Sequence, residues 1–80
     1  MKISNLETLS ASYKSLKEIQ KKLQDVMIDE ENELEKLSES DHKGEPGAQL
    51  GFEIDALDNI DYLIDQVIDF IEENLGDRLN

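Results

Sequence analysis

The chain has 80 residues, of which 20 are acidic and 8 are basic, so its net charge at neutral pH is −12. A chain of this length forms one small domain of marginal stability, and the absence of cysteine excludes disulfides and thiolate metal sites as added support. Self-association or a partner then remains as the way to bury more apolar surface. The negative charge disfavours direct binding to nucleic acid and to anionic membranes, because both require Lys and Arg.

Apolar residues are scattered along the chain, and no continuous apolar stretch is long enough for a transmembrane helix. The first residues, Met1 to Ser4, lead into mixed polar sequence and not into the apolar core of a signal peptide. We therefore expect a cytoplasmic protein. High charge with few aromatic residues is also typical of disordered chains, but the regular spacing of the apolar residues favours a folded protein.

The first helix is predicted over about residues 4–39. Ser4 and Glu7 have the spacing of a capping box, in which side-chain oxygens accept hydrogen bonds from free backbone N–H groups. Apolar residues then recur at alternating intervals of three and four, a repeat that favours supercoiling against a neighbouring helix. Two polar residues, Gln20 and Glu30, interrupt this stripe. Its members are Leu6, Leu9, Tyr13, Leu16, Leu23, Met27, Leu34 and Leu37.

The pattern is lost over about residues 40–51, which hold the only proline and three of the four glycines. Glycine and proline at this density indicate a turn between helices. Gly44 suits a left-handed helix cap, and Pro46 suits the first turn of the next helix. We predict a loop within a single domain that covers residues 1–80, because neither helix could form a core alone.

The second helix is predicted over about residues 52–75. Its apolar residues cover about half of the helix circumference, with Ile60 and Val67 in the main stripe and Leu63 and Phe70 on its flank. One antiparallel partner helix cannot cover so wide a stripe. The predicted fold class is therefore all-α, an antiparallel two-helix hairpin that pairs into a dimeric four-helix bundle, with a different protein in that place as the other solution. The predicted oligomer interface is Leu57, Ile60, Leu63, Ile64, Val67, Phe70 and Ile71.

The second helix also carries eight acidic residues between Glu53 and Glu73 and no basic residue. Most of them lie opposite the apolar stripe. Two interpretations stay open: a solvated face partly neutralised by the lysines of the first helix, or a surface that binds a basic partner. The predicted partner-binding residues are Asp55, Asp58, Tyr62, Asp65, Asp69, Glu72 and Glu73.

The sequence predicts no catalytic residues, no cofactor and no metal site. Paired carboxylates act as acid and base only where a pocket separates their pKa values, and two helices form little concavity. Weak binding of Mg²⁺ or Ca²⁺ by Asp58, Asp61 and Asp65 is the least favoured option. His42, the single histidine, is too little for a di-metal site in a bundle.

These observations predict a non-enzymatic protein-interaction module. It would be a small acidic adaptor, chaperone or inhibitor that acts through its helix faces on another protein with a basic surface. The alternative is an acidic mimic of nucleic acid, a phage-type inhibitor of a DNA- or RNA-binding protein. The alternative predicts a continuous exposed negative track and binding that weakens steeply with salt.

Overall fold

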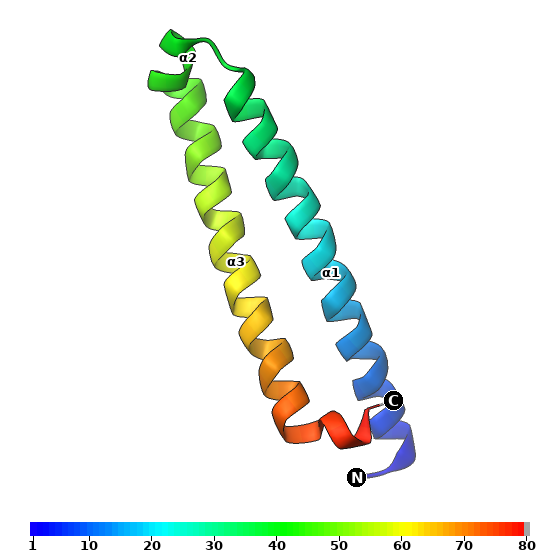
Figure 1. Cartoon of the computed structure of the whole chain (residues 1–80). Coiled ribbons are helices and arrows are strands. Elements are labelled where there is room, and N and C mark those ends of the chain that lie inside the picture. Colours follow the sequence, from blue (N-terminus) through cyan, green and yellow to red (C-terminus); the bar gives the residue numbers. More distant parts are fainter. Residues whose placement is uncertain (80) are drawn as a thin grey trace.

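A computed structural model describes residues 1–79, and Asn80, the last residue of the predicted domain, lies outside the described residues. Two long helices, α1 (Ile3–Lys36) and α3 (Glu45–Leu75), pack side by side and antiparallel (Figure 1). The short helix α2 (Glu39–Lys43) joins them, and the 3₁₀ helix η1 (Gly76–Arg78) follows α3. Residues 1–79 contain no strand, so the all-α prediction is confirmed. Pairing with a second copy stays a prediction.

The helices begin at other residues than the sequence predicted. The start of α1 is Ile3, with Lys2 as its N-cap and no side-chain cap, so the predicted capping box of Ser4 and Glu7 is wrong. Residues 45–51, predicted as loop, form the first turns of α3. Pro46 is tolerated there because the first N–H groups of a helix have no partner within it.

The connection between the long helices is itself mostly helical. Ser38 caps α2, since its Oγ accepts a hydrogen bond from the backbone N–H of Asp41 at 3.3 Å. Gly44 lies between α2 and α3 with φ −95° and ψ −161°. This is extended backbone that other residues also adopt, so the predicted left-handed cap at Gly44 is wrong.

The long helices meet along a seam that repeats at intervals of three and four. On α1 it is the predicted stripe together with Gln20 and Glu30, and all of its members are half-buried. Ile68 on α3 is the only large apolar residue within residues 1–79 that is buried, and it keeps 3% of its surface exposed. The seam of α3 consists of Gly47, Leu50, Ile54, Leu57, Asp61, Ile64, Ile68, Ile71 and Leu75.

The hairpin is narrow, and its core is one seam deep. Its principal dimensions are 58 × 15 × 14 Å, close to the cross-section of two packed helices. No helix formed by residues 1–79 combines the length and the hydrophobicity that crossing a membrane requires.

Gly47 is buried where α2 folds over the first turns of α3. A Cβ atom built at Gly47 would overlap the carbonyl oxygen of His42 and lie 2.6 Å from its carbonyl carbon. Backbone atoms cannot rotate away as a flexible side chain would. The close approach of α2 to α3 therefore requires glycine at this position.

We expect Gly47→Ala to lower the free energy of unfolding by about 1–3 kcal/mol, because the added methyl group forces α2 away from α3. Gly51→Ala is the matched control: a Cβ there meets no atom within 4 Å, and alanine in a helix interior stabilises by about 0.5–1 kcal/mol. Urea unfolding followed by circular dichroism measures both. Equal stability of the two variants would contradict the packing of α2 on α3.

Candidate functional site

The seam divides the surface of the hairpin into two sides, and these sides differ in chemistry. Successive residues of a helix are turned by about 100°. In two antiparallel helices, the residues directly before seam positions therefore lie on one side of the hairpin, and the residues directly after them lie on the other. We call the side formed by the preceding residues the apolar side, and the side formed by the following residues the acidic side.

The apolar side carries a row of exposed large side chains. On α3 the row repeats at intervals of three, four and three, and two residues of α1 one heptad apart lie on the same side. Scattered exposed apolar residues are ordinary, but a contiguous row indicates an interaction surface. The exposed fractions are 47% for Ile19, 48% for Val26, 43% for Ile60, 59% for Leu63, 48% for Val67 and 67% for Phe70.

The seven residues predicted as an oligomer interface fall into two groups. Three of them, Leu57, Ile64 and Ile71, are half-buried in the seam against α1. The other four, Ile60, Leu63, Val67 and Phe70, are exposed on the apolar side, where a shallow apolar groove follows the last three. Ile60 and Val67 of the predicted main stripe are thus outside the seam, because the seam positions beside them are Asp61 and Ile68.

Two hydrogen bonds across the seam fix the level of one helix against the other. Gln24 Nε2 donates to Asp61 Oδ1 at 3.0 Å, and Gln20 Nε2 donates to Asp65 Oδ1 at 3.2 Å. Gln20 thus lies level with Asp65, and Gln24 lies level with Asp61. The sequence did not predict these pairs. The interruption of the first stripe at Gln20 was the one visible signal.

The acidic side holds most of the predicted partner-binding residues. Glu73 lies one position further round the helix, towards the outer surface of α3. All seven are exposed, and the Tyr62 hydroxyl accepts a hydrogen bond of 2.7 Å from Gln66 Nε2. The six that directly follow seam positions are Asp55, Asp58, Tyr62, Asp65, Asp69 and Glu72.

The lysines of α1 do not form ion pairs with this row. Within residues 1–79, the ion pairs of up to 4.0 Å are Lys36 with Glu33 and Lys43 with Glu39, each within one helix. Lys17 Nζ donates instead to the Tyr13 hydroxyl at 3.2 Å and lies 5.0 Å from the centre of its ring. The pKa of Lys17 is raised, first by this hydrogen bond and then by the charges of Tyr13 and Glu72. The row on α3 is therefore not ion-paired with α1 within residues 1–79, although Lys14, Lys17 and Lys21 directly follow seam positions and lie on the same side.

Glu30 places a carboxyl group in the seam beside Glu53. A hydrogen bond to Glu53, burial and the charge of Glu53 raise the pKa of Glu30 above its usual 4.5. This hydrogen bond needs a proton on one of the two carboxyls. When both are ionised neither can donate, and Glu30 Oε2 is buried without a partner.

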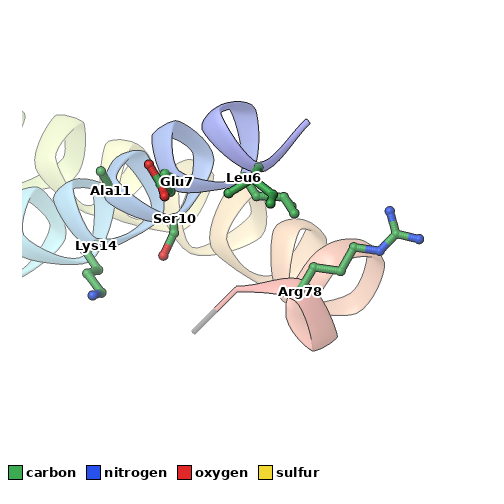
Figure 2. Close-up of a pocket in the computed structure, with 7 residues that line it drawn as sticks. Leu6, Glu7, Ser10, Ala11, Lys14 and Arg78 are labelled. Carbon is green, nitrogen blue, oxygen red and sulfur yellow. The ribbon is translucent and has the colours of Figure 1, made fainter. Parts of the chain in front are cut away.

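The described residues do not assemble a metal site. No group of three or more His, Asp and Glu side chains within residues 1–79 is placed to hold a metal ion. Asp58, Asp61 and Asp65 do not converge, since Asp61 enters the seam. At the open end of the hairpin a shallow hollow of about 340 Å³ lies between α1 and η1. Figure 2 shows the Arg78 side chain there pointing away from the labelled residues of α1.

Comparisons with known proteins add no relative to these observations. No protein-family model, no curated protein and no solved structure matches the chain. The function must therefore be argued from the two sides of the hairpin.

Glu30→Gln is expected to stabilise the hairpin at neutral pH. Because the pKa of Glu30 is raised in the folded state, the folded chain binds more protons than the unfolded chain above about pH 4.5, and stability falls as pH rises through that window. Glutamine keeps the shape and removes this loss.

The control for that variant is Glu18→Gln, which removes an exposed charge from the same helix. Urea midpoints measured between about pH 4 and pH 7 should show a flatter pH dependence for Glu30→Gln than for the wild type and the control. Parallel curves for all three proteins would contradict the role assigned to Glu30.

Proposed function

We propose that the chain is a non-enzymatic protein-interaction module, a small acidic adaptor, chaperone or inhibitor that acts through the two sides of its hairpin. The observation that carries this proposal is the apolar row on α3, in which Leu63 and Phe70 are each more than half exposed. Full burial of such side chains contributes about 1.5–3 kcal/mol each. An 80-residue chain with a single seam leaves that contribution unused unless a partner covers the row.

A second hairpin is the partner that we propose for the apolar side, giving the dimeric four-helix bundle. Each helix of such a bundle contacts two neighbours in directions about 90° apart. The seam row and the exposed apolar row of α3 are offset by one residue, so they point in directions about 100° apart. One row then contacts α1 of the same chain, and the other contacts the second copy.

The acidic side is the surface that we propose for a protein partner with a basic surface. It lies opposite the apolar side, so it stays accessible when the apolar side is covered. Its row from Asp55 to Glu72 is exposed and forms no ion pair with the lysines of α1 within residues 1–79. Such a surface attracts a positively charged partner over distance and speeds its association.

A second candidate function is mimicry of nucleic acid, in the manner of phage-type inhibitors of DNA- or RNA-binding proteins. The observation that favours it is the absence of any basic residue between Glu53 and Glu73, so that the exposed row of α3 carries five carboxylates and no positive charge. A protein bound in this way would lose affinity steeply as salt rises, and a DNA or RNA duplex would compete for it.

We expect the double charge reversal Asp58→Lys with Asp69→Lys to remove binding partners that the wild-type chain captures from lysate of its source cells. Both residues are exposed, so the hairpin should fold normally. The double variant Glu18→Lys with Asp25→Lys is the control, because it changes the net charge equally at exposed positions on the outer surface of α1, away from the acidic side. Partners that survive both variants would contradict a binding role for the acidic side. Partners displaced by a nucleic-acid duplex would favour mimicry.

A further inference from the structure

We propose that the second copy packs its α3 antiparallel on the α3 of the first, with the two-fold axis at the level of Asp65. This arrangement rests on the proposed dimer and specifies its contacts. The row Ile60, Leu63, Val67 and Phe70 has intervals of three, four and three, which are the same in both chain directions. Two antiparallel copies of the row therefore match residue for residue.

The contacts across such an axis are reciprocal, since a two-fold interface uses the same patch on both copies. An axis midway between Leu63 and Val67 sets Leu63 of one copy against Val67 of the other. It also sets Ile60 against Phe70 of the other copy, so an aromatic ring meets a smaller side chain at each end. All four of these side chains are exposed in the single hairpin.

The other closed arrangement would pack α3 on α1 of the second copy, whose apolar side carries only two large apolar residues, Ile19 and Val26. The hydrogen bonds of Gln20 and Gln24 place Lys22 level with Leu63 and Ser15 level with Phe70. In that arrangement both apolar side chains would meet polar side chains of the second copy. Packing α3 on α3 avoids both mismatches.

In this arrangement the apolar sides of the two copies meet, so both acidic sides stay exposed. The two acidic sides point away from each other on opposite surfaces, which keeps the largest negative charges of the two chains apart. The dimer is thereby bivalent and offers two equal acidic surfaces to two basic partners.

Distances between spin labels on the two copies test the arrangement, and the absence of cysteine allows one label per chain. We would label Gln49→Cys and, separately, Asn59→Cys, both exposed on α3. The two labelled positions are ten residues apart, which is about 15 Å along the helix in each copy. With α3 on α3, the two labels at position 49 should therefore be about 30 Å further apart along the bundle than the two labels at position 59. With α3 on α1 of the second copy every residue is level with its counterpart, and the two distances along the bundle would be equal.

Equal distances would overturn the packing of α3 on α3 and leave the dimer of the proposed function standing. A complete lack of dipolar coupling at every concentration would overturn both the packing of α3 on α3 and the dimer. Phe70→Asp supplies a second test, because it should weaken dimerisation by more than about tenfold. Phe52→Asp is its control: Phe52 is 75% exposed on the same helix but lies outside the row. An equal effect of both variants would also overturn the proposal.

Discussion

The structure depends on a single seam between two helices, and a single seam covers only one row of each. α3 has two rows of apolar residues, offset by one residue, and α1 packs against one of them. Ile68, in the covered row, is the only large apolar residue within residues 1–79 that is buried. A partner on the apolar side would cover the exposed second row. It would also add stability to a short chain that has no disulfides.

Two hydrogen bonds across the seam fix the register of the helices. Gln20 in the seam donates to Asp65 beside it, and Gln24 beside the seam donates to Asp61 in it, so two seam positions are polar where apolar residues would give more stability. Polar groups at such positions are known to fix register in paired helices. Here the fixed register places Ile19 of α1 beside the row of α3 on the apolar side. It leaves the opposite side to the acidic residues.

The sequence predicted the all-α fold and the two long helices, because intervals of three and four can be counted directly. It placed Pro46 correctly in a first helical turn but began the helix too late, since the glycines up to residue 51 indicated a loop, whereas Gly47 serves a close backbone contact with His42. The division of the apolar residues was also partly wrong. Asp61 occupies a seam position, and only its partner Gln24, thirty-seven residues away, explains why a carboxylate is accepted there. Such a pairing between distant residues cannot be found from periodicity.

The central claim is that the exposed row of α3 is covered side by side by a second hairpin. Small-angle X-ray scattering over a dilution series tests it most directly. We expect the scattering mass to double with concentration while the longest dimension grows by only about 15 Å from the 58 Å of one hairpin, because the axis at Asp65 lies about five residues from the middle of α3. A monomer mass at every concentration, or a dimer about twice as long as one hairpin, would contradict the claim.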